Sequence, residues 1–121
     1  MKRTSSAEYS ERLKAYDKLV ATNPEVQRKG ATVPYTSVNG HMFSYLSKSG
    51  ELALRLPADA LQTFLEKYNT SLCKQYGVVQ KEYAIVPNEL LYKTQELKHF
   101  FDLSYGYVRS LKPKQAKRGK V

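Results

Sequence analysis

The chain has no tryptophan and a single cysteine among its 121 residues, so it cannot form an internal disulfide. Secreted domains of this length usually carry paired cysteines, which favours a reduced, cytoplasmic setting. Long apolar runs are also missing, because no stretch approaches the roughly 18 apolar residues that a membrane-spanning helix needs. The first residues lead into charged side chains instead of an apolar signal segment. We therefore expect a soluble cytoplasmic protein with one domain.

Motifs for enzyme chemistry are equally scarce. The two histidines and one cysteine show none of the usual zinc-site spacings, and no glycine-rich nucleotide loop occurs. We expect no catalytic residue, no cofactor and no metal. One enzymatic alternative stays open, a Cys/His site, because distance along the sequence does not separate Cys73 from His41 or His99. Otherwise we expect His41 to be exposed beside a turn, His99 to be partly buried on a helix and Cys73 to be an ordinary strand residue.

Acidic residues are absent from both ends of the chain, and this accounts for most of the net charge of +9. Between Thr4 and Leu111 there are 13 basic residues and 11 acidic ones, so the body is nearly neutral. We expect residues 1–4 and 114–121 to be disordered and residues 5–113 to form the domain. The alternative function for the tail is contact with nucleic acid. Its residues would be Lys112, Lys114, Lys117, Arg118 and Lys120.

Apolar residues at helical spacing predict three main helices. The first helix follows a capping box at Ser5–Glu8, the second follows Pro57, and Thr94 is expected to cap the last helix. A further helical turn is expected at residues 89–92. The apolar stripes are Tyr9, Leu13, Tyr16 and Val20, then Leu61, Phe64, Leu65 and Tyr68, and finally Leu97, Phe101, Ser104, Val108 and Leu111.

Between these helices the apolar period changes to two, which is typical of strands. Asn39-Gly40 predicts a two-residue hairpin turn, and Ser49-Gly50 a second, weaker one. Two more strands are expected near residues 71–76 and 80–86. The order α-β-β-β-α-β-β-α predicts an α+β fold, with a five-stranded antiparallel sheet and helices mainly on one face. This register puts Phe43, Tyr45, Leu52, Leu54 and Leu56 under the helices.

The same register leaves an imperfectly polar face toward water. Its apolar members are Val33, Tyr35, Met42, Leu46 and Ala53. We expect this patch to bind a protein, most simply a second copy of the chain through a two-fold contact. The alternative is that a loop or residues 26–30 fold across the patch and hide it. Base stacking on Tyr35 beside Arg55 is a weaker alternative.

Four segments resemble the N-terminal domain of the TfoX/Sxy competence regulators. They are Asn39-Gly40-His41-Met42-Phe43, Glu51-Leu52-Ala53-Leu54-Arg55-Leu56, Lys81-Glu82-Tyr83-Ala84-Ile85-Val86-Pro87 and Arg109-Ser110-Leu111-Lys112-Pro113. The resemblance spans residues 6–113, and the family's Met-Phe-Gly-Gly-like stretch is replaced here by Lys29–Pro34. It implies an α-β(3)-α-β(2)-α fold and a bacterial regulatory role without a defined active site.

Overall fold

The computed structural model describes residues 6–30, 33–75 and 77–111. Residues 1–4 and 114–121, which were expected to be disordered, lie outside the described residues, so this expectation is not tested. The order of elements matches the predicted one, with a short helix where the helical turn was expected. The elements are α1 (Ser6–Ala21), β1 (Tyr35–Val38), β2 (His41–Leu46), β3 (Leu52–Arg55), α2 (Ala58–Lys67), β4 (Leu72–Gln75), β5 (Val78–Val86), α3 (Asn88–Leu91) and α4 (Thr94–Arg109).

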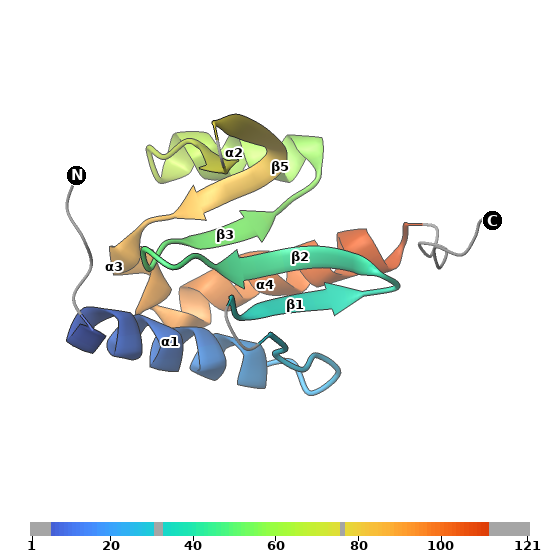
Figure 1. The fold of residues 1–121 in the computed structure, drawn as a ribbon. Coiled ribbons are helices and arrows are strands. Elements are labelled where there is room, and N and C mark those ends of the chain that lie inside the picture. The colour runs from blue at the N-terminus through green and yellow to red at the C-terminus, as the bar shows by residue number, and fades with distance from the viewer. Residues whose placement is uncertain (1–5, 31–32, 76, 112–121) are drawn as a thin grey trace.

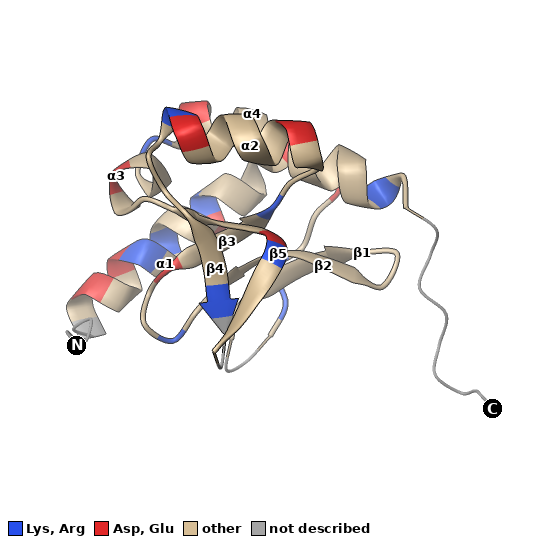
Figure 2. Cartoon of the chain, turned by 90° about the horizontal axis from the view of Figure 1, so that it is seen from above, with Lys and Arg blue, Asp and Glu red and all other residues tan. Residues whose placement is uncertain are grey.

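The strands form one antiparallel sheet in the order β1-β2-β3-β5-β4. In Figure 1 the strands lie side by side, with α4 behind β2 and α1 beside β1. The view from above shows α2 and α4 on one side of the sheet, while the β4–β5 hairpin extends to the opposite side (Figure 2). The α+β prediction is therefore confirmed, and no helix of residues 6–30, 33–75 and 77–111 covers the other face of the sheet. No helix in the described part of the chain has the length and apolar character needed to cross a membrane.

The predicted helical stripes form the core on the covered face. Leu97, Phe101 and Val108 of α4 are each 0% exposed, because their spacing puts them on one side of the helix facing the strands. Half-buried side chains complete this layer at its margins. They are Leu13 on α1, Leu61 and Leu65 on α2, and Leu111 after α4. The same face holds Phe43, Leu52, Leu54 and Leu56 of the sheet, as predicted.

The first hairpin has the predicted turn but not the predicted continuation. Asn39 and Gly40 both have positive φ, at 55° and 82°, and Val38 lies opposite His41 as expected for a two-residue turn. Ser37 still lies opposite Met42, but the preceding residue, Thr36, lies opposite Ser44. Phe43 is therefore the extra residue of a β-bulge in β2. Every residue of β2 after Phe43 therefore faces the opposite way from the prediction.

The second hairpin also differs from the prediction. The Ser47 amide donates to the Glu51 carbonyl at 2.8 Å, and the Gly50 amide donates to the Ser47 carbonyl at 2.9 Å. Gly50 has a φ of 87°, so the loop has three residues, as in a turn that ends in a bulge. Leu46 consequently lies opposite Leu52 instead of Ala53. Two predictions were wrong for this reason: Leu46 is 0% exposed inside the main core, and Tyr45 lies on the helix-free face.

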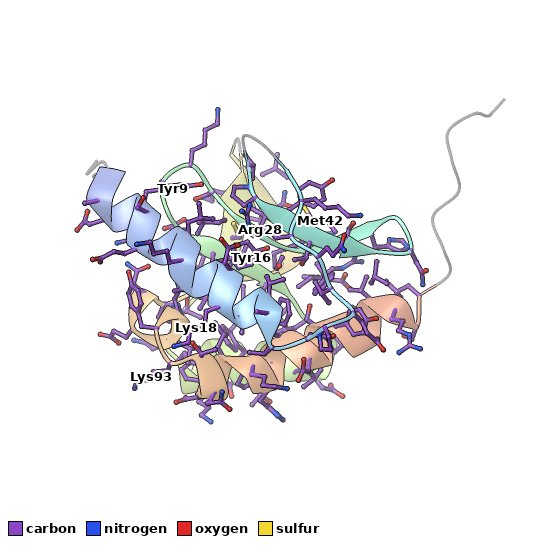
Figure 3. The ribbon with its side chains drawn as sticks, turned by 90° about the horizontal axis from the view of Figure 1, so that it is seen from below. Tyr9, Tyr16, Lys18, Arg28, Met42 and Lys93 are labelled. Atoms are coloured by element: carbon purple, nitrogen blue, oxygen red, sulfur yellow. The ribbon has the colours of Figure 1, made fainter. Side chains whose placement is uncertain are left out.

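A chain of hydroxyl groups fixes the bulge to α1. A hydrogen bond of 2.6 Å joins Tyr16 Oη to Ser44 Oγ, and one of 2.5 Å joins Ser44 Oγ to Thr36 Oγ1. All three side chains are 0% exposed, and Tyr16 points from α1 toward the sheet (Figure 3). Burial raises the pKa of the Tyr16 hydroxyl well above its ordinary value, so the group stays neutral. The polar atoms introduced by the bulge are therefore satisfied inside the core.

Candidate functional site

The helix-free face of the sheet, here called the outer face, has a small core of its own. Tyr45, Ala53 and Cys73 are buried there and contact one another. Tyr45 Oη lies 3.0 Å from Cys73 Sγ, and the Tyr83 hydroxyl donates to the Met42 carbonyl at 2.7 Å. Half-buried side chains surround this small core. They are Val33, Tyr35, Met42, Tyr83 and Ile85.

The β4–β5 hairpin bends away from the rest of the sheet toward the outer face (Figure 2). Leu72 lies opposite Ala84, but Lys74 lies opposite Val79, so β5 contains several extra residues at this point. Such an irregularity bends a strand and increases its twist. The bend leaves Val78 61% exposed and Val79 46% exposed at the tip of the hairpin.

An open groove of about 800 Å³ lies between this hairpin and the β2–β3 loop. Its apolar lining consists of Val33, Met42, Tyr45 and Val78. Its polar lining is Ser47, Lys48, Ser49 and Glu51 from the β2–β3 loop, and Lys74 and Gln80 from the β4–β5 hairpin. Half of these ten residues are exposed, so the groove is an open surface feature and not an enclosed cavity.

Positive charge gathers in the sheet and its loops. Residues 28–56 and 70–87, which form the sheet and its loops, contain six Lys or Arg and two acidic residues. The remaining described segments, residues 6–27, 57–69 and 88–111, hold the helices and contain seven basic and nine acidic residues. Figure 2 shows the acidic positions along the helices and a basic position on β4. Arg28 and Arg55 are paired with Asp17 and Glu82. Lys48 and Lys74, on opposite walls of the groove, are not among the ion pairs of the described residues.

The structure keeps four of the five predicted patch residues on the outer face. Val33, Tyr35 and Met42 are half-buried there, while Ala53 is on the correct face but 0% exposed beneath its neighbours. Leu46 is excluded because it belongs to the main core. Residues 26–30 run along the edge of the sheet: Val26 packs into the main core and Lys29 pairs with Tyr35. This segment does not occupy the groove, whose lining residues come from elsewhere.

The three residues of the enzymatic alternative lie in different parts of the fold. His41 is half-buried at the start of β2, where we expected exposure, and Cys73 is buried beneath Tyr45 on the outer face. His99 is exposed on α4, where we expected partial burial, and its ring contacts Phe100 edge-on. The sheet separates Cys73 from His99, because α4 packs on the covered face.

A second hollow of about 580 Å³ lies between α2 and α4, and His99 lines it. The Tyr68 hydroxyl donates to Glu96 Oε2 at 2.6 Å beside this hollow. Burial and the neighbouring Glu96 carboxylate raise the pKa of Tyr68 to about 12, which makes it a hydrogen-bond donor rather than a base at neutral pH. This arrangement ties α2 to α4.

Arg55, Glu82 and Tyr107 form a hydrogen-bonded cluster at the boundary of the two faces of the sheet. Arg55 Nε donates to Glu82 Oε1 at 2.6 Å, and the Tyr107 hydroxyl donates to Glu82 Oε2 at 2.8 Å. Burial acts to raise the pKa of Glu82, but these hydrogen bonds and the charge of Arg55 outweigh it and hold that pKa below its ordinary value. Both carboxylate oxygens have partners, so the cluster has a structural role in joining β3, β5 and α4.

The residues proposed for nucleic-acid contact in the tail lie outside the described part of the chain. They are Lys112, Lys114, Lys117, Arg118 and Lys120. On the outer face, Tyr45 is 4% exposed and its ring packs against Tyr83 at 5.7 Å between centroids. A nucleobase needs an exposed aromatic ring face to stack on. Tyr45 is buried and Tyr83 is half-buried against it, so neither ring is well placed for stacking.

Sequence reasoning missed Tyr45, Val78 and the two groove lysines. The signal for Tyr45 was the glycine at the third position of Lys48-Ser49-Gly50, which is typical of a three-residue hairpin loop. Val78 was expected in the connection between the last two strands, and the structure makes it the first residue of β5, at the exposed tip of the hairpin. The lysines come together only in the folded chain.

Comparisons with family models, with curated proteins and with solved structures found no match to this chain. The resemblance to the competence-regulator domain is therefore a prediction that rests on its four segments alone.

Proposed function

We propose that this protein is a small non-catalytic binding module that holds a segment of a partner protein in the outer-face groove. The proposal rests on one observation: the helix-free face carries an open groove with an apolar floor, bordered by the exposed Val78 at the tip of a bent hairpin. Water-exposed apolar side chains beside a groove are typical of protein-binding surfaces. A regulatory role of the kind that the TfoX-like resemblance implies, in the cytoplasm of a bacterium, is compatible with such a module.

The floor of the groove is suited to binding without chemistry. Tyr45 and Cys73 are buried and hydrogen-bonded to each other, and the Tyr83 hydroxyl donates a hydrogen bond to the Met42 carbonyl. These groups therefore hold the floor rigid, and the residues exposed to a partner are mainly the aliphatic Val78, Ser49 and the charged Lys48, Glu51 and Lys74. A rigid apolar floor with a polar rim is the usual anatomy of a protein interface.

The test is affinity capture from a native lysate with three versions of the protein. Val78→Asp puts a charge into the groove at a residue that is 61% exposed, and Tyr92→Asp is the matched control at a residue that is 50% exposed on the helix side. We expect partners that bind the wild type and Tyr92→Asp equally and are lost from Val78→Asp, by quantitative mass spectrometry. A set of partners that is the same for all three versions would contradict the proposal.

A further inference from the structure

The charges around the groove indicate the chemistry of its partner. Lys48 stands on the β2–β3 loop and Lys74 on β4, so one lysine borders each side, and Glu51 is the acidic residue of the lining. Both lysines are exposed and neither is in an ion pair of the described residues, so carboxylates supplied by a partner would complement their charge. The surplus of positive charge in the sheet as a whole extends this preference beyond the rim.

The floor sets a second requirement. Met42 and Val33 are half-buried and Val78 is largely exposed, so an apolar side chain laid between them would remove apolar surface of both molecules from water. Met42, labelled in Figure 3 on β2, gives this floor an adaptable thioether side chain. A purely charged ligand would leave this surface exposed.

We propose that the groove binds an acidic peptide segment with apolar side chains, the apolar groups resting on Met42, Val33 and Val78 and the carboxylates facing Lys48 and Lys74. This inference rests on the proposed function and names the partner's chemistry. It differs from the two-fold contact expected from the sequence, because a second copy bound through the same groove would bring the lysines of both copies into one interface. The buried Tyr45 and its packing on Tyr83 favour a peptide over a nucleic acid.

The experiment is selection from a displayed library of random peptides on the immobilised wild-type protein, with Val78→Asp as the counter-selection surface. We expect enriched sequences with an excess of Asp and Glu next to Leu, Ile, Val or Phe. Enrichment of basic or uncharged sequences that are lost with Val78→Asp would overturn the acidic partner and leave the proposed function standing. Failure to enrich any sequence that depends on Val78 would overturn both.

The most enriched peptide is then synthesised with a fluorescent label and titrated by anisotropy. Lys48→Glu and Lys74→Glu should each weaken binding by about three- to tenfold, with Lys93→Glu, on the helix side, as the control that leaves binding unchanged. Raising the ionic strength from about 0.05 M to about 0.5 M should weaken wild-type binding as well, because exposed charges are screened. Equal binding by Lys74→Glu and Lys93→Glu would overturn the inference.

Two further measurements separate the other occupants. A labelled single-stranded DNA oligonucleotide of mixed sequence should not compete with the peptide; competition that is lost with Lys74→Glu would assign the groove to nucleic acid. Sedimentation at tens of micromolar should give the same mass for the wild type and Val78→Asp. A dimer of the wild type that Val78→Asp abolishes would assign the groove to a second copy. Either result would overturn the acidic peptide.

Discussion

The two faces of the sheet are built from the same strands but differ in how they are closed. On the covered face, apolar side chains of β2 and β3 meet the stripes of α1, α2 and α4 and form the main core. On the outer face, Tyr45, Ala53 and Cys73 are buried only by half-buried neighbours in the sheet and its edge. The comparison indicates that one face supplies most of the stability and leaves the other available for contact with a partner. Changes on the two faces should therefore have different consequences.

The largest expected effect comes from truncating Leu46 on the covered face. Leu46→Ala should lower the free energy of unfolding by about 2–5 kcal/mol, because it leaves a cavity in a fully buried layer. Met42→Ala is the matched change on the outer face of the same strand and should cost less, since the neighbours of a half-buried side chain are partly open to water. Urea denaturation measures both. Equal losses would break the distinction between the faces.

The hydroxyl chain on the covered face should give the next largest effect. Tyr16→Phe removes the hydrogen bond to Ser44 and should cost about 1–2 kcal/mol. Tyr9→Phe, at a half-buried position on the same helix, is the control and should change stability by less than about 0.5 kcal/mol. Thermal unfolding followed by circular dichroism compares the two variants with the wild type. A Tyr16→Phe protein as stable as the Tyr9→Phe control would show that the buried chain contributes nothing.

Glu82 provides a pH-dependent test at the boundary of the two faces. Its pKa is lower in the folded protein than in the unfolded chain, so the carboxylate contributes stability above the ordinary value of about 4.5, and this contribution disappears as the pH falls through the lower folded value. Because the side chain is 37% exposed, Glu82→Gln should cost only about 0.5–1 kcal/mol at neutral pH. The gap in stability between variant and wild type should close at acid pH. A gap that stays constant with pH would show that the charge does not matter.

The smallest expected effect on stability is at the hairpin tip. Val78→Asp should change the free energy of unfolding by less than about 0.5 kcal/mol, because the side chain is 61% exposed. The same variant should lose partner binding in the capture experiment. A destabilisation comparable to that of Leu46→Ala would mean that the tip packs as core, and the loss of binding could then not be assigned to the groove.

The helices and the order of elements could be predicted from the sequence because each depends on local signals. The apolar stripe of α4 and the Asn39-Gly40 turn both act within a few residues. The faces of β2 could not be predicted in full, because the bulge at Phe43 adds one residue and the three-residue loop changes the register again. Strict alternation then assigns Tyr45 and Leu46 to each other's face. The Leu52-x-Leu54-x-Leu56 pattern was assigned correctly because its three leucines fix which face of β3 is buried.

The groove could not be predicted from the sequence, because it depends on how far the β4–β5 hairpin bends toward the outer face. Val33, Tyr35 and Met42 were placed on the correct face from alternation alone. Lys48 and Lys74 are separated along the chain, and their positions on opposite walls follow from the register shift between β4 and β5. No spacing in the sequence encodes that shift.

The contact between Tyr16 and the bulge also has a consequence for how the chain folds. A strand that pairs one residue out of step presents its opposite set of side chains to the helices. In this protein such a slip would turn Ser44 away from Tyr16 and leave a phenol hydroxyl in the apolar core with its partner lost, at the cost of an unsatisfied buried donor. Docking of α1 therefore selects the correct strand alignment, because Tyr16 keeps its hydrogen bond only when the hairpin has formed with the bulge in place.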